Sequence, residues 1–336
     1  MAHPLLVTGA GGVVGQSLVE CFGPGRVIGL VRPAGNRPDG AAELIAGDVT
    51  RPRIGLDAPA YAALAGRIGG VLHSAALTSF TRAAADIHDV NATGTAHALR
   101  LAEDAGVPFH LISTIYVHRR DGSHEHGRSR PYRESKRAAE DTVRAARVPW
   151  SILRMSLVIG DSATGSTPRF QGVYAAMKSL ITGGAPVVPV AAGSYVDFLP
   201  RDHVARSVRA LVDSGALGEH WITAGERALT IEEFVERCLG YARRQGRTVP
   251  RPRLVDSEMV HRLIIPAFGD SIGADLRKRL ELFTDILGPL ATDRTLPRLP
   301  DDLPGLGAPP DLGACLDTSL EFFGTRARLA ATGTPA

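Results

Sequence analysis

A tyrosine and a lysine four residues apart, Tyr132 and Lys136, have the types and the spacing for acid–base chemistry. Pro131 suits the first position of a helix, and residues four apart on a helix share one face. An ammonium close to a phenol favours the phenolate, so we expect Lys136 to lower the pKa of Tyr132 from its ordinary value of about 10. Such a phenol would exchange a proton with an alkoxide near neutral pH. Taken alone, this spacing is common on helix surfaces, so the hypothesis depends on its surroundings.

Two hydroxyl residues, Ser113 and Thr114, follow an apolar run, Phe109 to Ile112, that predicts a strand. Thr114 would then stand at the end of this strand and hydrogen-bond the same carbonyl oxygen as Tyr132. Asn91 opens a helical segment that stops at Gly106. Its side chain either joins the polar network of the site or belongs to an ordinary helix residue. The predicted catalytic residues are Thr114, Tyr132 and Lys136.

A glycine-rich turn, with Gly9, Gly12 and Gly15 spaced three apart, follows the short apolar run Leu5 to Val7. We expect a strand before the turn and a helix from Val13 and Val14 onward. The first glycine permits the tight turn, the second lets the backbone approach a diphosphate, and the third lets helix and strand pack closely. The start of the helix would present N–H groups and the positive end of its dipole to phosphates. The turn therefore predicts a dinucleotide site, although a glycine triplet alone also occurs in flexible turns.

The second predicted strand, Val27 to Val31, is followed by Arg32. In folds of this type an acidic residue at this point binds the ribose of NAD, whereas an arginine accommodates the 2′-phosphate of NADP. No Asp or Glu occurs from Val27 to Arg37. This favours NADP(H), with a solvated Arg32 at a strand end as the alternative.

Two further strand ends carry residues suited to the cofactor. Asp48 and Val49 follow the strand Leu44 to Ala46, and Asp48 would either accept from the adenine amino group or cap the helix that begins near Pro52. The strand Gly70 to Leu72 leads into Ala75 and Ala76, whose small side chains would let the backbone lie against a ligand. We expect His73, between them, to be a packed strand residue.

Strand and helix patterns alternate from residue 5 to about 225, which is typical of an α/β fold with a doubly wound parallel sheet. Trp150 to Ile159 is a further predicted strand and Val187 to Val190 a short one. The helical patterns of the second half are Phe170 to Ile181, Val204 to Leu211, Ile231 to Arg244, Glu258 to Ile265, Asp275 to Leu287 and Thr318 to Leu329.

The composition is that of a globular protein, with 44% hydrophobic and 22% charged residues. The net charge of +3 is no evidence for nucleic acid. Three scattered cysteines indicate neither a disulfide framework nor a zinc site, which favours a reducing compartment. No apolar run approaches 18 residues and no signal peptide is evident, so we expect a cytoplasmic protein without a membrane span. We expect the linker with His118, His124 and His126 to be a solvated loop rather than a metal site.

Together, the ordered motifs resemble an extended short-chain dehydrogenase/reductase over roughly residues 5 to 230. The motifs that carry this resemblance are the stretch 8–15, Gly47-Asp48-Val49, His73-Ser74-Ala75-Ala76, Asn91-x-x-Gly94-Thr95, Ser113-Thr114 and Tyr132-x-x-x-Lys136. Leu30-Val31-Arg32, the stretch from His73 to Phe80, Ser113 to Val117 and Gly160 to Gly165 look like the branch of thioester reductases and male-sterility-type fatty acyl-CoA reductases.

The resemblance implies roles and a domain plan. Tyr132 would be the proton donor or acceptor, Lys136 would also hold the nicotinamide ribose, and Thr114 would orient the substrate oxygen. A Rossmann domain would occupy residues 1–165, with the chain re-entering it at about 195–225. Residues 166–330 would form a mainly helical substrate-binding or lid region, whose apolar helices would serve as a lid, a homodimer face or ordinary packing.

The function expected from these observations is NADPH-dependent reduction of a ketone, an aldehyde or an acyl-thioester. A thioester would arrive on coenzyme A or on a separate carrier protein. Two alternatives remain: an NAD-dependent nucleotide-sugar epimerase or dehydratase, which uses the same three residues, and a non-catalytic NADP-sensing protein. The missing acidic residue after Val31 disfavours the first, and the presence of both Tyr132 and Lys136 disfavours the second. The sequence identifies neither the substrate nor the oligomeric state.

Overall fold

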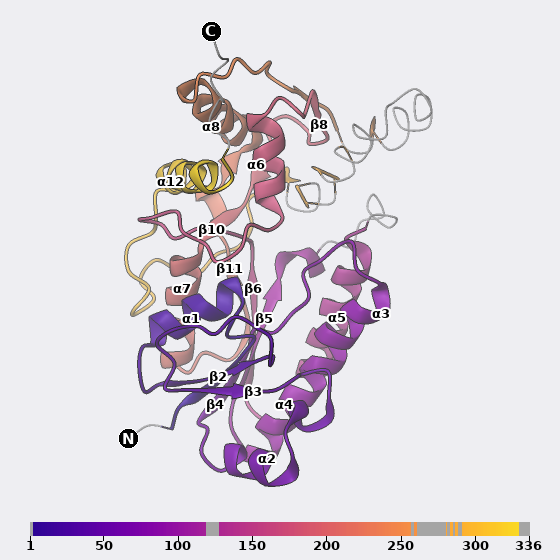
Figure 1. The fold of residues 1–336 in the computed structure, drawn as a ribbon, viewed down its shortest axis with the longest axis vertical. Helices are drawn as coiled ribbons and strands as arrows, with labels where there is room; N and C mark the ends of the chain where they lie inside the picture. Colours follow the sequence, from indigo (N-terminus) through magenta and orange to yellow (C-terminus); the bar gives the residue numbers. More distant parts are fainter. Residues whose placement is uncertain are drawn as a thin grey trace.

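A parallel sheet forms the centre of the molecule (Figure 1). The computed structural model describes residues 3–118, 128–256, 259–260, 280, 283–284, 286–287 and 291–328. Within these residues the main sheet has seven strands, all paired in parallel. From one edge to the other they are β11 (Gly218–Ile222), β6 (Trp150–Met155), β5 (Phe109–Thr114), β4 (Gly70–His73), β1 (Leu5–Thr8), β2 (Val27–Val31) and β3 (Glu43–Ala46).

Helices cover both faces of this sheet, because alternate side chains of a strand point to opposite faces. Leu5 and Val7 of β1 pack in one cluster with α1 (Val13–Phe22) and α7 (Arg201–Asp213). Leu6, between them, packs in a second cluster with α2 (Ala58–Ala65), α4 (Gly94–Ala105) and α5 (Arg130–Arg144). The predicted doubly wound α/β fold is confirmed.

A second lobe lies beyond one end of the sheet and contains α6 (Val173–Ile181), α8 (Ile231–Arg244) and α12 (Leu312–Arg326) (Figure 1). α8 begins with a capping box, in which Thr230 accepts from the backbone N–H of Glu233 and the Glu233 side chain accepts from that of Thr230. Short strand pairs accompany the helices: β7 (Leu157–Ile159) with β10 (Phe198–Pro200), β8 (Val187–Val188) with β13 (Arg253–Leu254), and β9 (Tyr195–Val196) between β12 (Leu229–Thr230) and β14 (Ala291–Thr292).

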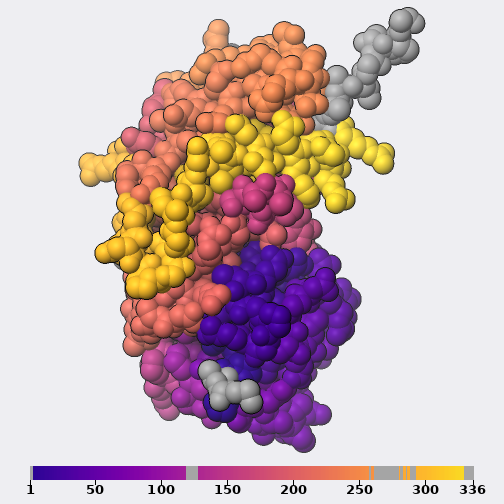
Figure 2. All heavy atoms as spheres, turned by 90° about the vertical axis from the view of Figure 1, so that its left-hand side faces the viewer, coloured from indigo at the N-terminus to yellow at the C-terminus, as the bar shows by residue number. Residues whose placement is uncertain are grey.

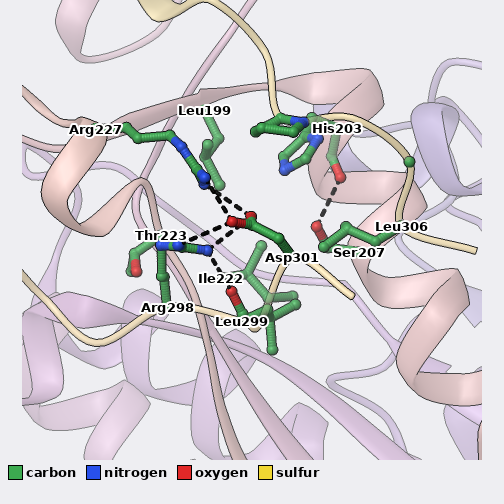
Figure 3. A pocket seen from close by; sticks show the side chains of 12 residues that line it. Leu199, His203, Ser207, Ile222, Thr223, Arg227, Arg298, Leu299, Asp301 and Leu306 are labelled. Atoms are coloured by element: carbon green, nitrogen blue, oxygen red, sulfur yellow. Dashed lines mark hydrogen bonds and ion pairs between the residues drawn. The ribbon is translucent and has the colours of Figure 1, made fainter. Parts of the chain in front are cut away.

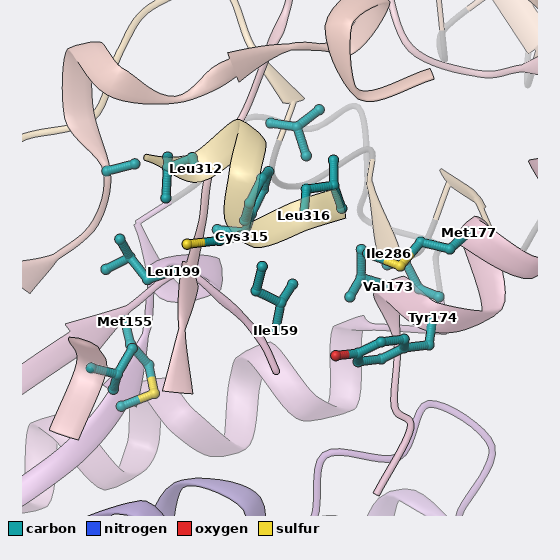
Figure 4. Packing of buried hydrophobic residues seen from close by; sticks show 14 of the residues in the cluster. Met155, Ile159, Val173, Tyr174, Met177, Leu199, Ile286, Leu312, Cys315 and Leu316 are labelled. Atoms are coloured by element: carbon teal, nitrogen blue, oxygen red, sulfur yellow. The ribbon is translucent and has the colours of Figure 1, made fainter. Parts of the chain in front are cut away.

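The hydrophobic core runs from the sheet into this lobe. Figure 4 shows Leu312 and Leu316 of α12 above Ile159 and Leu199, which belong to the strand pair β7 and β10. α12 also packs against α8. In Figure 2 the C-terminal segment lies between the residues around α8 and the N-terminal residues, so the end of the chain covers one side of the molecule.

Several predicted boundaries are wrong. The strand predicted over Trp150–Ile159 is two strands, because the chain leaves the main sheet at Ser156 and β7 pairs with β10 instead. α6 starts at Val173, after Gly172, rather than at Phe170. α7 (Arg201–Asp213) is longer than the predicted helix Val204–Leu211. α12 runs from Leu312 to Arg326, whereas Thr318–Leu329 was predicted. An additional helix, α3 (Ala84–His88), precedes Asn91.

Two of the predicted helices, Glu258–Ile265 and Asp275–Leu287, lie largely outside the described residues, as do His124 and His126. Among the residues that are described, no helix combines the length and apolarity that a membrane crossing requires.

Candidate active site

A cavity of about 570 Å³ opens where the strand order reverses, between β1 and β4, at the carboxyl ends of the strands. Open parallel sheets bind their ligands at this point. The cavity brings together seven of the predicted cofactor residues: Gly9, Gly12, Arg32, Asp48, Val49, Ala75 and Ala76. Val13, Val14 and Gly15 lie in the first turn of α1 and do not line it.

The glycine turn is built for close backbone approach. Gly9 has φ +67°, and a Cβ there would stand 2.6 Å from the Cα of Ala75. A Cβ on Gly15 would stand 2.1 Å from the carbonyl oxygen of Gly9, so helix and turn pack without room for a side chain. No side chain caps the start of α1 and its first turn has no acidic residue. These features fit a diphosphate at the helix N-terminus, and the cavity therefore suits a dinucleotide.

Arg32 and Asp48 line the same cavity from the ends of neighbouring strands. Asp48 accepts two hydrogen bonds at Oδ1 from Thr50, from the backbone N–H at 3.0 Å and from the hydroxyl at 2.8 Å. The short helical turn Pro52–Gly55 has Arg51 as its N-cap, so the alternative role of Asp48 as a helix cap is wrong. Arg37 does not line the cavity.

Thr114, Tyr132 and Lys136 come together beside the end of β5. The Thr114 side chain lies beside the Tyr132 phenol, close enough to act on its pKa. One turn further along α5, Lys136 Nζ donates to the carbonyl oxygen of Ile112 at 2.7 Å. Thr114, Tyr132 and Lys136 are 6%, 8% and 2% exposed, so all three functional groups are withdrawn from bulk water.

Burial shifts the pKa of Tyr132 in the direction opposite to the one predicted. The pKa is raised to about 12 by desolvation, and the neighbouring Thr114 side chain opposes this only in part. Lys136 does not lower it, since its ammonium is directed to the backbone of Ile112. The prediction of a lowered phenol pKa is therefore wrong for this structure, because desolvation raises the pKa while the Lys136 ammonium faces a backbone carbonyl instead of the phenol.

Two aromatic rings produce this burial. The Phe80 and Tyr116 rings each lie 5.8 Å from the Tyr132 ring, measured between centroids. Phe80 belongs to the segment after β4 that also contributes Leu77 to the cavity wall, while Tyr116 follows β5. The phenol thus lies in an apolar pocket formed by segments that are distant in sequence.

Asn91 connects the cavity to the helix that carries Tyr132. Its Oδ1 accepts from the backbone N–H of Leu77 at 2.7 Å, and its Nδ2 donates to the Ser135 hydroxyl at 2.9 Å. Ser135 in turn donates to the carbonyl oxygen of Tyr132 at 2.8 Å. Of the two roles considered for Asn91, the structure shows membership of the polar network.

His73 is a packed strand residue, as predicted. It is 1% exposed, and its Nδ1 lies 2.8 Å from the Thr8 hydroxyl. That hydroxyl also accepts from the N–H of Ala75 at 3.2 Å, so the pair supports the turn on which Ala75 lies. Burial lowers the pKa of His73 to about 3, which keeps the ring neutral.

A second cavity, of only about 20 Å³, lies near α7 and the C-terminal connection (Figure 3). Asp301 at its edge accepts paired hydrogen bonds from Arg227, at 2.6 and 2.9 Å, and from Arg298, at 2.8 and 3.1 Å. Arg298 also pairs with Glu226 at 2.6 Å, so two guanidiniums and two carboxylates neutralise one another, and we interpret the cluster as structural.

Comparison with known proteins agrees with this geometry. The family model described as male sterility protein matches residues 39–208, half of the chain. A linear gramicidin synthase from Brevibacillus parabrevis is 29% identical over 181 residues, and an isonitrile lipopeptide synthase from Streptomyces coeruleorubidus is 27% identical over 174. These matches cover 49% and 48% of the chain but only 4% and 12% of the relatives, so the chain corresponds to a small part of each.

Solved structures show the same fold. The terminal R domain from the myxalamid PKS-NRPS pathway superposes with a TM-score of 0.73 at 22% identity, covering 98% of this chain and 92% of that one. The reductase domain of a nonribosomal peptide synthetase from Mycobacterium tuberculosis gives 0.66 at 17% identity, with coverage of 98% and 92%. The chain therefore belongs to the male sterility protein family and has the fold of these reductase domains.

Proposed function

We propose that this protein reduces an acyl-thioester with NADPH, and that Tyr132 is the proton donor. The observation that carries the proposal is the buried pair Tyr132 and Thr114, with Lys136 one turn away on the same helix face. The pair lies at the same sheet edge as the glycine-lined cavity, since β1, β4 and β5 are parallel and end there.

The cavity residues suit particular parts of the cofactor. Gly9, Gly12 and the start of α1 would hold the diphosphate, and Arg32 the 2′-phosphate, which favours NADPH over NADH. Asp48, Val49, Ala75 and Ala76 would line the adenosine side, with Tyr132 and Lys136 beside the nicotinamide ribose. When bound, the reduced nicotinamide supplies a hydride to the carbonyl carbon.

The protein's own side chains manage the charge on the substrate oxygen. Thr114 would donate a hydrogen bond to the carbonyl and orient it. Tyr132, whose raised pKa of about 12 keeps it protonated at neutral pH, would then give its proton to the oxygen as negative charge develops there. Lys136 would hold the nicotinamide ribose, and the Phe80 and Tyr116 rings would exclude water from the phenol.

The relatives support a thioester as the substrate class. The curated relatives are peptide synthases, and one structural neighbour is a thiolation-reductase di-domain, with a TM-score of 0.64 at 18% identity. We infer that the acyl group arrives as a thioester on a carrier protein or on coenzyme A. One thioester and one NADPH, with a proton, would give an aldehyde, a free thiol and NADP⁺.

A substrate screen tests the proposal. NADPH or NADH oxidation would be followed by absorbance with acyl-coenzyme A, acyl-pantetheine, aldehyde and ketone substrates, and thiol release would be measured in parallel. We expect NADPH oxidation matched by thiol release. Oxidation with ketones or aldehydes but no thioester would disprove the substrate class. If neither nicotinamide is oxidised and the purified protein instead retains NAD, the epimerase or dehydratase reading would replace the proposal.

A further inference from the structure

A buried carboxylate, Glu140, lies one turn beyond Lys136 on α5 and is 2% exposed. It accepts hydrogen bonds from three side chains. Ser113 donates its hydroxyl at 2.6 Å, Arg154 donates from Nε at 3.0 Å and from its terminal nitrogen at 2.7 Å, and Arg144 donates at 2.8 Å. A buried charge with this many donors is held in one position.

These contacts join three elements of the site. Glu140 lies on α5 with Tyr132 and Lys136, Ser113 precedes Thr114 on β5, and Arg154 lies on β6. The carboxylate therefore sets how the helix with the proton donor lies against the strand with the hydroxyl that orients the substrate. The Arg154 guanidinium also lies 5.4 Å from the Trp221 ring centroid, which completes its packing.

The same carboxylate is the negative charge that acts on Lys136. Burial lowers the pKa of Lys136 to about 8, while the charge of Glu140 acts to raise it. The other titratable neighbours of Lys136 are neutral near pH 7, because the pKa of His73 is lowered to about 3 and that of Tyr132 is raised to about 12. Without Glu140, burial alone would act on the ammonium.

The surrounding charges are balanced. Arg154 pairs with Glu140 at 2.7 Å and with Glu219 at 2.8 Å, and Arg144 pairs with the same two carboxylates, each at 2.8 Å. Arg144 also pairs with Asp141 at 2.7 Å, near the surface. Two carboxylates and two guanidiniums therefore sum to zero at the centre of this network, and the loss of Glu140 would leave a net positive charge beside Lys136.

We propose that Glu140 is a positioning residue for the reduction: it keeps Lys136 cationic and holds the helix of Tyr132 in register with the strand of Thr114. The inference rests on the proposed function, because its consequence for catalysis passes through Lys136. Glu140 itself would touch neither substrate nor cofactor.

The chain offers a direct readout, because it contains only three lysines, Lys136, Lys178 and Lys278. With isotope-labelled lysine, the NMR signal of each side-chain Cε reports its ionisation, and the Lys136 signal is identified by its loss in Lys136→Arg. Lys178 is exposed on α6 and serves as an internal reference. This titration needs neither turnover nor a bound cofactor.

Three variants give opposed expectations. Glu140→Gln should move the Lys136 midpoint to lower pH by about one pH unit. Arg144→Gln, which removes a half-exposed cation from Glu140, should move it to higher pH by less. The matched control Asp141→Asn removes the same charge one residue away, on a side chain that is 65% exposed, and should leave the midpoint nearly unchanged because water screens it.

The inference would be overturned if the Lys136 titration midpoint in folded Glu140→Gln equals that of the wild type. It would also be overturned if Asp141→Asn moves the midpoint as far as Glu140→Gln does. If Glu140→Gln does not fold, the test depends on Arg144→Gln. A Lys136 midpoint that does not rise in Arg144→Gln would then overturn the inference. In the turnover assay, the alkaline limb of the kcat/KM profile should follow each midpoint. A wild-type protein that oxidises no NADPH would overturn the proposed function instead, while the NMR midpoints would still decide whether Glu140 acts on Lys136.

Discussion

Replacing Tyr132 by phenylalanine removes the proposed proton donor and leaves its ring in place. The ring packs against Phe80 and Tyr116 at centroid distances of 5.8 Å, and these contacts do not involve the hydroxyl. Loss of the hydroxyl costs at most an ordinary hydrogen bond, about 1 kcal/mol, which is small against the 5–15 kcal/mol that typically stabilises a domain. We therefore expect Tyr132→Phe to fold and to bind NADPH as the wild type does.

The effect on turnover should be much larger. General acid catalysis by a positioned side chain contributes about 10²–10⁴-fold, so kcat should fall by that factor, which corresponds to about 3–5 kcal/mol of transition-state stabilisation. The matched control is Tyr116→Phe. Tyr116 is also buried, but its hydroxyl donates to the carbonyl oxygen of Ile286 at 3.0 Å, away from the proposed site.

The assay compares kcat from NADPH oxidation with NADPH affinity from fluorescence titration for both variants. We expect Tyr116→Phe to retain kcat within about threefold, since it loses one hydrogen bond worth about 1 kcal/mol of stability. A Tyr132→Phe enzyme with kcat within about tenfold of the wild type would refute the assignment of Tyr132 as proton donor. Equal losses in the two variants would show that the Tyr132 hydroxyl has no catalytic role beyond that of the Tyr116 hydroxyl.

Three further predictions concern the cofactor cavity and the core. Arg32→Asp should weaken NADPH binding by about tenfold or more while changing NADH binding much less, as measured by fluorescence titration; equal losses would remove Arg32 from the phosphate site. Gly15→Ala should lower the free energy of unfolding by about 1–3 kcal/mol and weaken both nicotinamides, because its Cβ would stand 2.1 Å from the Gly9 carbonyl oxygen. Gly66→Ala is its control in urea denaturation, since a Cβ there meets nothing nearer than 3.6 Å, and equal destabilisation would contradict the steric argument. Burial lowers the pKa of His110 to about 4, so this ring stays neutral in the folded protein while the unfolded chain takes up a proton below about pH 6.5. Stability should consequently fall by about 2 kcal/mol on this account between pH 7 and pH 5, and His110→Gln should show a shallower decline; an equally steep decline would exclude His110 as a source of acid sensitivity.

The elements that form from local signals were predictable. β2 and α8 have the bounds that the apolar patterns predicted, because a strand between turns and a helix with a capping box depend on neighbouring residues. The single strand over Trp150–Ile159 failed because apolar residues continue past Ser156 although the sheet does not. Which strand Leu157–Ile159 pairs with depends on β10, about forty residues away, and no local pattern contains that information.

The network of Ser113, Glu140 and Arg154 was not predicted, although one signal was present. Glu140 stands four residues after Lys136, as Lys136 stands four after Tyr132, so all three share one helix face. That spacing indicates a common face but does not say that the face is buried. The partners on β5 and β6 are known only once the strands are adjacent.

By itself, the sequence determined the alternation that builds the parallel sheet, the glycine turn and the placement of Tyr132 and Lys136 on one helix face, because each follows from residues close together in the chain. The protonation state of the phenol depends on contacts that form only in the folded protein. Phe80 and Tyr116 come from different segments and remove water from Tyr132, so its pKa rises to about 12 where the neighbouring lysine alone suggested a fall. The physical reason is that desolvation depends on every group packed around a site, whereas spacing along the chain reports one neighbour at a time.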